Sequence, residues 1–509
     1  MGVAIVSAIG LSSNVAHAGG FEIPDSGTQA LGRGGAFTAK ADDPTAIHHN
    51  AAGLAQQRGT RVLVNANVSQ SSMTFQREGS YADDPQNAAT PWGGTPYPAV
   101  TNQGGPVVLP FLAAASDFGL NWMTFAIGTH APPAGAFAGR HFPTVVDGKP
   151  GPARYDAVGG TSSLILFHTA AVGVRLNETF DIGATFHLVQ ASVTTRTVSY
   201  VDLGGTCTNK EYQPCDGTAQ GGAKGFTATG ALSGLARLGA GLTAGLQVRG
   251  PVVMNLVGES ETIAPRVTPN VELAKSRRTV KNAFPWVVRT GLRKAFKTGA
   301  WEDGDLELDV VYERWSDAQN PGIVAGFDKL GPSAQPAEVV VVHGYKDTVS
   351  LRLGGAYNTI AAGVPLTLRL GTYYDSSATA SNVTRVDVDT LAKIAGTAGI
   401  GVKLRGFTLE LAYASVFDVS RTVSDGVIRP INGAKEGKPI DQQGNPLPAV
   451  NNGVYSGHTH MASIGVVVEL DRVLGWGKPS SKPKDERPEP GGDPWKRDQA
   501  VRGREPRRF

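Results

Sequence analysis

Apolar and polar residues alternate in many short segments between about residue 60 and residue 470. The segment 349–357, VSLRLGGAY, places Ser350 and Arg352 on one face and its large apolar residues on the other. Because successive side chains of a strand point to opposite faces, this period of two predicts an all-β chain. The period does not say whether the apolar face meets a protein core or lipid, since soluble sandwiches and membrane barrels both alternate in this way.

The connections between the alternating segments are alternately short and long. Short turns are predicted near Asp117–Asn121, Asn177–Glu178, Arg237–Leu238, Lys297–Gly304, Ile360–Gly363 and Arg405–Gly406. Short turns on one rim and long loops on the other are typical of an outer-membrane barrel. A transmembrane antiparallel β-barrel of about 14 strands is predicted, near residues 61–77, 106–117, 122–131, 161–176, 179–203, 226–237, 241–258, 284–297, 304–317, 345–358, 364–376, 392–405, 407–421 and 457–470. An even number places both termini on the periplasmic side.

The charged faces of the predicted strands point into the barrel lumen. With a turn centred near Trp301, Arg293 falls opposite Asp309 and Arg289 opposite Glu313. Lys403 likewise falls opposite Glu410 across the predicted turn at Arg405–Gly406. Opposite charges on neighbouring strands fix their register, so these residues are interpreted as interior pairs. A second role stays open, because a free guanidinium of Arg289, Arg293, Arg352 or Arg369 could hold a ligand carboxylate.

The two ends of the chain differ from the predicted barrel. Residues 1–18 have a short apolar run followed by Ala16-His17-Ala18, which predicts a cleaved signal peptide, although no Lys or Arg precedes the run. No segment has 18 consecutive apolar residues, which argues against a helical membrane protein. Residues 472–509 carry 11 Lys and Arg against 6 Asp and Glu among many Pro and Gly, and are predicted to be a disordered basic periplasmic tail.

Composition excludes several classes of protein. The net charge is only +3 over 509 residues and the basic residues before the tail are dispersed, so no nucleic-acid partner is expected. Cys207 and Cys215 are the only cysteines, and in an exported chain they are expected to form a disulfide that tightens a long loop. No set of ligands has metal-site spacing, so no metal and no cofactor are expected. The remaining histidines are scattered and no Gly-x-Ser-x-Gly elbow occurs, so the chain is not expected to be an enzyme.

Several separated stretches resemble one family. They are GGFEIPDSGTQALGRGGAFTAKADDPTAIHHNAAGLA (19–55), YERWS (312–316), GYKDTVSLRLGGAY (344–357), RLGTYYDSSAT (369–379) and GHTHMASIGVVVEL (457–470). Together they resemble the FadL/TodX-type outer-membrane transporters of long-chain fatty acids and other hydrophobic compounds. The resemblance implies a barrel over residues 60–471, a hatch formed by residues 19–59, and passive transport by a monomer with sideways exit into the outer-membrane lipid.

The hatch motif departs from the family at one residue. Asp42, Asp43 and Pro44 match the family's opening and could begin a helical turn. The family's Asn-Pro-Ala-Gly corresponds to Asn50, Ala51, Ala52 and Gly53, so the proline with its fixed torsion is missing. His48 and His49 are interpreted as polar residues packed against the wall rather than metal ligands.

Apolar residues in one long loop, Phe137 and Phe142, are candidates for capturing a hydrophobic substrate, and simple loop packing is the alternative.

Other classes of protein stay open at this point. A general diffusion porin or a structural surface barrel would share the strands but need no lipid cargo. A secreted soluble β-protein would lack the asymmetry between short turns and long loops.

Overall fold

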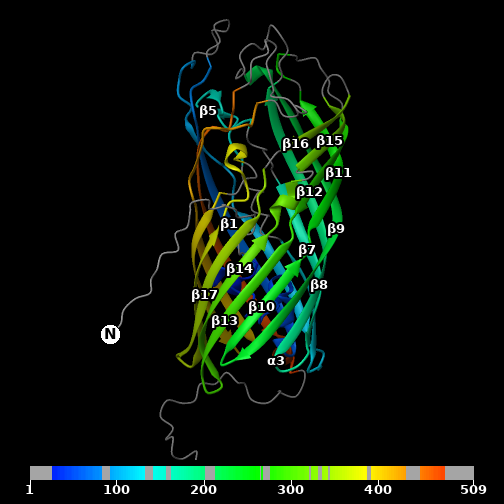
Figure 1. Ribbon diagram of the computed structural model, residues 1–509, viewed down its shortest axis with the longest axis vertical. Coiled ribbons are helices and arrows are strands. Elements are labelled where there is room, and N and C mark those ends of the chain that lie inside the picture. Colours follow the sequence, from blue (N-terminus) through cyan, green and yellow to red (C-terminus); the bar gives the residue numbers. More distant parts are fainter. Residues whose placement is uncertain are drawn as a thin grey trace, which may run out of the picture.

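The computed structural model is a tall, closed, antiparallel barrel of fourteen strand positions (Figure 1). It describes residues 26–82, 92–131, 141–155, 162–200, 213–263, 265–267, 275–319, 323–330, 335–341, 344–386, 391–430 and 448–475. The predicted signal peptide, the loop residue Phe137 and the predicted basic tail after Gly475 lie outside this description. None of the described helices is long and apolar enough to cross a membrane.

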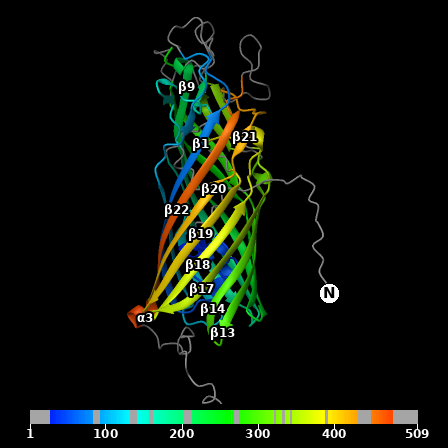
Figure 2. The same cartoon turned by 90° about the vertical axis from the view of Figure 1, so that its left-hand side faces the viewer.

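The wall is built by strands that pair with their neighbours along the chain. They are β1 (Thr60–Arg77), β3 (Val107–Ser116), β4 (Met123–His130), β7 (Ser162–Arg175), β8 (Phe180–Tyr200), β9 (Asp216–Gly239), β10 (Leu242–Arg249), β11 (Val252–Ile263), β12 (Ser276–Phe284), β13 (Val287–Thr298), β14 (Trp301–Glu313), β17 (Thr348–Ala361), β18 (Val364–Asp375), β19 (Lys393–Leu404), β20 (Phe407–Asp418) and β22 (Gly453–Glu469). The first and last strands pair from Arg61 opposite Glu469 to Arg77 opposite Gly453, which closes the barrel. Figure 2 shows this seam between β1 and β22.

Shorter elements lie at the ends of the wall. The strands are β2 (Ala99–Thr101), β5 (Val145–Val146), β6 (Lys149–Pro150), β15 (Ile323–Leu330), β16 (Gln335–Val341) and β21 (Arg421–Val423). The helices that follow the first strand are η3 (Gln213–Cys215), η4 (Trp315–Gln319), η5 (Ser381–Val383) and α3 (Leu470–Leu474). Helix α3 lies at the rim of the short turns, where Asp471 accepts a hydrogen bond from the backbone N–H of Thr60 at 2.8 Å.

The predicted strand count is confirmed, and the details of the seventh and eighth positions differ. The predicted turn at Arg237–Leu238 is wrong, because β9 continues to Gly239 and the turn residues are Ala240 and Gly241. The predicted strands 241–258 and 284–297 are each interrupted, at Gly250–Pro251 and at Pro285–Trp286. Proline lacks the backbone N–H that a central strand needs. The seventh and eighth positions are therefore each divided into a lower and an upper strand.

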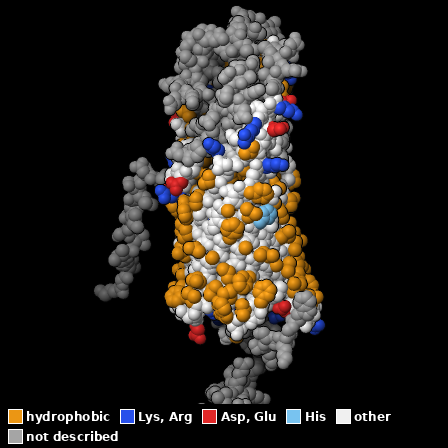
Figure 3. Space-filling model, turned by 90° about the vertical axis from the view of Figure 1, so that its right-hand side faces the viewer, with side chains coloured by type: hydrophobic (Ala, Val, Ile, Leu, Met, Phe, Trp, Pro, Cys, Tyr) orange, Lys and Arg blue, Asp and Glu red, His pale blue; other side chains and the backbone are white. Residues whose placement is uncertain are grey.

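The apolar face of the strands points outward. Leu308, Leu351, Leu353, Leu409 and Leu411 are each 42–54% exposed. On the side of the barrel that Figure 3 shows, hydrophobic side chains likewise form an apolar belt across the lower part. Asp309 and Arg352, on two of the same strands, are at most 2% exposed. This arrangement is that of a membrane barrel and excludes a soluble sandwich, in which the apolar faces would be buried against one another.

Candidate functional site

The lower lumen is filled by residues 26–57, here called the inner segment. It consists of α1 (Thr28–Gly32), α2 (Ala46–His49) and η1 (Ala51–Gln56) with the turns between them. Nearly every residue of these three elements is buried. The segment contacts strands on different sides of the barrel, including β7, β8 and β9 through η1 and β18, β19 and β20 through α1. The described part of the predicted hatch therefore lies inside the barrel.

Glycines in the wall allow the inner segment to approach closely. A Cβ added to Gly183 of β8 would lie 2.3 Å from the backbone N of Ala52. One added to Gly371 of β18 would lie 2.2 Å from the carbonyl carbon of Arg33. Any larger residue at these two positions would have to displace the inner segment. Sequence reasoning missed this role, although glycines at inward positions of predicted strands were a visible signal.

The acidic pair Asp42 and Asp43 lies at the turn that leads into α2. Asp43 accepts hydrogen bonds from the backbone N–H of Thr45 at 2.7 Å and from Gln29 Nε2 at 3.0 Å. Burial raises the pKa of Asp43 above its usual value, and the hydrogen bonds from Thr45 and Gln29 oppose that shift. Asp42 pairs with Lys40 at 2.9 Å. Pro44 supplies the carbonyl that accepts from Ile47.

Asn50 links the inner segment to itself and to the wall. Its Nδ2 donates to the carbonyl of Thr38 at 2.8 Å and to the carbonyl of Gly234 in β9 at 3.1 Å. Its Oδ1 accepts from the backbone N–H of Ala52 at 3.1 Å, which caps η1. Thus the amide keeps these contacts although Ala51 stands where the family has proline.

Replacing Ala51 with proline should leave the fold intact and change the free energy of unfolding by less than about 1 kcal/mol. Ala51 is the first residue of η1, a position that suits proline, and Asn50 before it is extended at φ −171° and ψ 100°. Denaturant unfolding of the purified protein measures the effect. Ala52→Pro is the matched control and should destabilise strongly, because it removes the N–H bound by Asn50. Equal losses in both variants would contradict this account.

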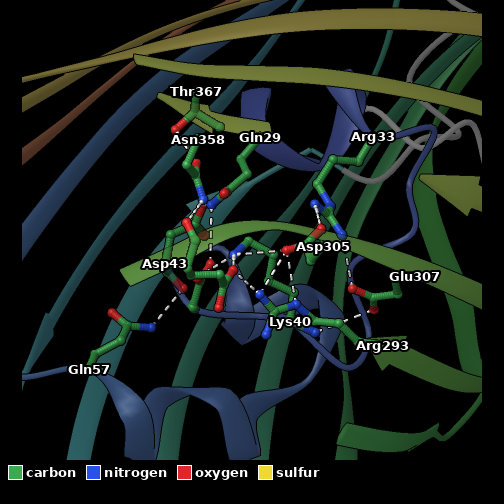
Figure 4. Close-up of polar contacts among 12 residues, drawn as sticks. Gln29, Arg33, Lys40, Asp43, Gln57, Arg293, Asp305, Glu307, Asn358 and Thr367 are labelled. Carbon is green, nitrogen blue, oxygen red and sulfur yellow. Dashed lines mark hydrogen bonds and ion pairs between the residues drawn. The ribbon is translucent and has the colours of Figure 1, made fainter. Parts of the chain in front are cut away.

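A row of buried carboxylates on β14 holds the opposite side of the inner segment. Asp305 pairs with Arg33 at 2.5 Å, and Glu307 pairs with the same guanidinium at 3.2 Å (Figure 4). Glu307 also accepts from the backbone N–H of Ala39 at 2.6 Å. Asp309 accepts from two further N–H groups of the inner segment, those of residues 37 and 38, each at 2.9 Å. These side chains sit at every second position of β14, so all three point inward.

Above the inner segment, the lumen is lined by an apolar cluster on one side of the barrel, here called the upper apolar cluster. Its members come from the inward faces of several strands and from η4, and they include Phe167, Val189, Met254, Leu256, Phe284 and Trp315. All six are at most 8% exposed. Because the long strands β8, β9 and β11 carry this lining upward, the cluster lies between the inner segment and the rim of the long loops.

Cationic and aromatic side chains form the floor of the upper apolar cluster. The guanidinium carbon of Arg249 lies 5.9 Å from the ring centre of Phe167. Arg289 donates to Gln247 Oε1 at 2.7 Å and lies 3.4 Å from the Nε2 atom of His48. Burial lowers the pKa of His48 well below its usual value, and the positive charge of Arg289 acts in the same direction. The ring of His48 is therefore neutral at pH 7.

Histidines that are far apart in the sequence meet at this floor. The ring of His48 lies 5.1 Å from that of His130, which lies 6.2 Å from that of His187. His187 Nδ1 lies 2.7 Å from Thr169 Oγ1. His130 and His187, which are scattered in the sequence, are thus brought next to His48 by β4, β8 and α2. Among the described residues, no group of three or more His, Cys, Asp or Glu is arranged to hold a metal ion.

Among the described residues, no strand stands between the upper parts of β3 and β7 beyond His130. Strand β4 ends there, with His130 opposite Phe111 of β3 and Phe167 of β7. Above this level, residues 107–110 of β3 pair only with β1, and residues 162–166 of β7 pair only with β8. The two strands that flank β4 therefore lack a described partner strand between them over the upper part of the wall. This gap among the described strands lies at the height of the histidines and the floor.

Comparisons with known proteins agree with this architecture. The family model described as outer membrane protein transport protein (OMPP1/FadL/TodX) matches residues 9–425. The chain belongs to this FadL/TodX family. It is accordingly an outer-membrane barrel of the FadL/TodX transporter type. No match was found among curated proteins.

Solved structures of very different sequence share the fold of this FadL/TodX-family chain. A Pseudomonas aeruginosa FadL homologue has a TM-score of 0.67 at 14% identity, with 88% of this chain and 99% of that chain covered. The Ralstonia pickettii toluene transporter TbuX has a TM-score of 0.61 at 16% identity, with coverage of 88% and 99%. The P. putida toluene transporter TodX has a TM-score of 0.58 at 14% identity, with coverage of 88% and 98%.

The predicted charge pairs of this FadL/TodX-family barrel are wrong in register, although the residues do point inward. Arg293 lies opposite Glu307 rather than Asp309, and its guanidinium pairs with Asp305 at 2.7 Å. Arg289 lies opposite Val311 rather than Glu313. The turn has only two residues, 299 and 300, and the register shifts at Phe296/Lys297, which moves each predicted pair by two positions.

The other predicted lumen residues also find different neighbours. Lys403 lies opposite Thr408, whereas Glu410 pairs with Arg369 of β18 at 2.8 Å. Arg352 lies opposite Asp309. Glu313 accepts hydrogen bonds from Trp315 Nε1 at 2.7 Å and Thr348 Oγ1 at 3.0 Å. Of the four arginines proposed to hold a carboxylate, only Arg289 lies at the floor described above.

Only some of the residues predicted to act in the long loops are described by the structure. Phe142 is 3% exposed and packs with Phe75, Val423 and Tyr455 at the rim of the long loops, which is the loop packing that the sequence left open. Cys215 is buried and disulfide-bonded. The second cysteine, Cys207, lies outside the described residues, as does Phe137.

Proposed function

We propose that this protein carries long-chain fatty acids across the outer membrane by passive transport, with the inner segment acting as a movable hatch. The rim of long loops faces the outside and both termini face the periplasm. The observation that carries the proposal is the upper apolar cluster, which stands directly above a cationic floor and beside the gap among the described strands. We propose that the transporter acts as a monomer, and the closure of the barrel within one chain through β1 and β22 is compatible with this.

An apolar path suits this cargo. Each CH₂ group gains about 0.8 kcal/mol when it leaves water, so an alkyl chain follows a lining of apolar side chains rather than a wet pore. The upper apolar cluster supplies such a lining from the loop rim down to the inner segment. The solved relatives TbuX and TodX are toluene transporters, which supports a hydrophobic cargo of some kind.

The floor favours a cargo with an acid group over a neutral hydrocarbon. Arg249 and Arg289 are 7% and 1% exposed and lie where the apolar lining ends. A guanidinium holds a carboxylate through charge-assisted hydrogen bonds, which are stronger when water is excluded. The alkyl chain would then lie along the upper apolar cluster while its carboxylate meets the floor.

The gap among the described strands above His130 supports a lateral exit. A cargo at the floor lies beside the upper ends of β3 and β7 where no described strand joins them, so a small shift of the inner segment would open a route into the membrane. A general diffusion porin would instead need an open lumen, and residues 26–57 occupy it here.

Uptake by cells that lack their own transporter tests the proposal. Cells with the intact protein should take up labelled oleate while remaining closed to small polar dyes. Arg249→Met should lower oleate uptake more than toluene uptake, since it keeps the bulk of the side chain and removes the charge. Gln247→Met is the neighbouring control and should affect both cargoes alike. Entry of polar dyes through the intact protein would favour the porin, and failure to move any apolar cargo would refute transport.

A further inference from the structure

Six charged side chains cluster on the outer surface of the barrel above the apolar belt. They project from four adjacent strand positions, and we call them the outer charged patch: Arg196, Lys224, Glu259, Glu261, Arg277 and Lys281. Their positions follow the outward alternation of β8, β9, β11 and β12. Figure 3 shows this side of the barrel, with charged side chains standing above the hydrophobic belt.

The register of the strands leaves the two lysines without an acidic residue directly beside them. Lys224 lies opposite Ser192 of β8 and Val257 of β11. Lys281 lies opposite Asn255 of β11. Glu259, by contrast, lies directly opposite Arg277. The two lysines flank β11, so they are about 10 Å apart across the sheet.

The patch sits at the edge of the lipid-facing surface. One step below Lys224 on β9, Phe226 is 65% exposed, and Val253, on β11 between the two strands that carry the lysines, is 55% exposed. Such large exposed apolar side chains face lipid tails in a membrane barrel. The cations directly above them therefore lie at the level of the lipid headgroups.

The strands on the opposite side of the barrel carry no comparable patch along their described lengths. Along the described lengths of β18, β19, β20 and β22, every charged residue lies at an inward position or at a strand end, and the outward positions are uncharged. The side that carries the patch is also the side whose inner face bears the upper apolar cluster.

We propose that the outer charged patch binds the phosphate groups of a phosphorylated glycolipid in the outer leaflet. Lys224 and Lys281 contact the phosphates while the apolar residues below them contact the acyl chains. Arg196 on the neighbouring strand β8 adds a further positive charge to the patch. The inference rests on the proposed orientation, in which the long loops face outside. A lipid bound at the outer charged patch would lie against the outer face of the wall whose inner face bears the upper apolar cluster.

Binding of lipid A to the purified full-length protein tests the inference. The double variant K224Q/K281Q is compared with K297Q/K346Q, which removes two exposed lysines elsewhere on the barrel. We expect the intact protein to prefer bis-phosphorylated lipid A over its dephosphorylated form. K224Q/K281Q should bind the phosphorylated lipid roughly tenfold more weakly, because each lysine near anionic lipid contributes to the attraction. The control pair should bind like the intact protein.

Three outcomes would overturn the inference. They are equal binding of both lipid forms by the intact protein, equal losses in the two double variants, and complete displacement of the lipid by excess inorganic phosphate, which would indicate a general anion site. Retention of the heat-modifiable folded band on gels shows that each variant forms its barrel. Oleate uptake is measured in the same variants: normal uptake without lipid preference refutes only this inference, whereas lipid preference without uptake of any cargo refutes only the transport proposal.

Discussion

Glu307→Ala should lower the free energy of unfolding of the barrel by about 3–5 kcal/mol. The carboxylate is fully buried and bonded to Arg33 and to the backbone N–H of Ala39. Its removal leaves part of a buried guanidinium and an N–H group without their acceptor, and both groups then carry an uncompensated desolvation cost. Denaturant unfolding in detergent measures the change, and single-barrel conductance measures whether the inner segment still fills the lumen.

Glu302→Ala is the matched control for this experiment. Glu302 belongs to the same strand and pairs with Arg293, but its side chain is 27% exposed. Arg293 also keeps Asp305 as a partner in this variant. Screening by water limits the expected loss to about 1 kcal/mol or less. Equal losses in the two variants, or a Glu307→Ala barrel as stable as the parent, would show that the carboxylate row does not hold the inner segment.

Locking the inner segment to the wall should stop transport. Thr28 of α1 and Ser463 of β22 have their hydroxyl oxygens 2.7 Å apart, and cysteine matches the length of both side chains. In the oxidised double variant T28C/S463C, oleate uptake should fall to the level of cells without the protein, because the hatch can no longer shift. Reduction of the engineered disulfide should restore oleate uptake. Uptake is measured in the same cells before and after the reductant is added.

A second engineered disulfide separates locking from mere cross-linking. Thr60 and Ser116 have hydroxyl oxygens 2.9 Å apart, and both belong to the wall, on β1 and β3. Oxidised T60C/S116C should transport normally, since it ties no residue of the inner segment. Reductant can also act on the native disulfide at Cys215. Uptake by the parent protein with and without reductant is therefore measured as the baseline. If oxidised T28C/S463C transports as well as the control, movement of the hatch at α1 is not needed.

The alternation of residues by itself determined the class of fold and the number of strand positions. Segments such as 349–357 carry the period of two over their full length, and the short turns mark one rim, so fourteen positions could be counted without any structure. Most predicted limits agree with the strands within a few residues, as for β17, β18 and β19. These features depend on local side-chain patterns, which the sequence displays directly.

The register and the pairing of charges were decided by the tertiary structure. Arg293 was placed opposite Asp309, but a two-residue turn and a register shift at Phe296/Lys297 place it opposite Glu307. A difference of two positions keeps every side chain on the correct face, so alternation cannot detect it. The inward direction of these residues was therefore predictable, whereas their partners were not.

The candidate site depends on contacts between distant parts of the chain. Arg33 meets Asp305 across 272 residues, and His48, His130 and His187 come from three separate elements. Among the described residues, the neighbours of β4 extend beyond it, which only the pairing of the wall strands reveals. The sequence determined which residues face the lumen. Closure of the barrel around residues 26–57 decided which of them meet, because that closure fixes the relative heights of strands that share no local pattern.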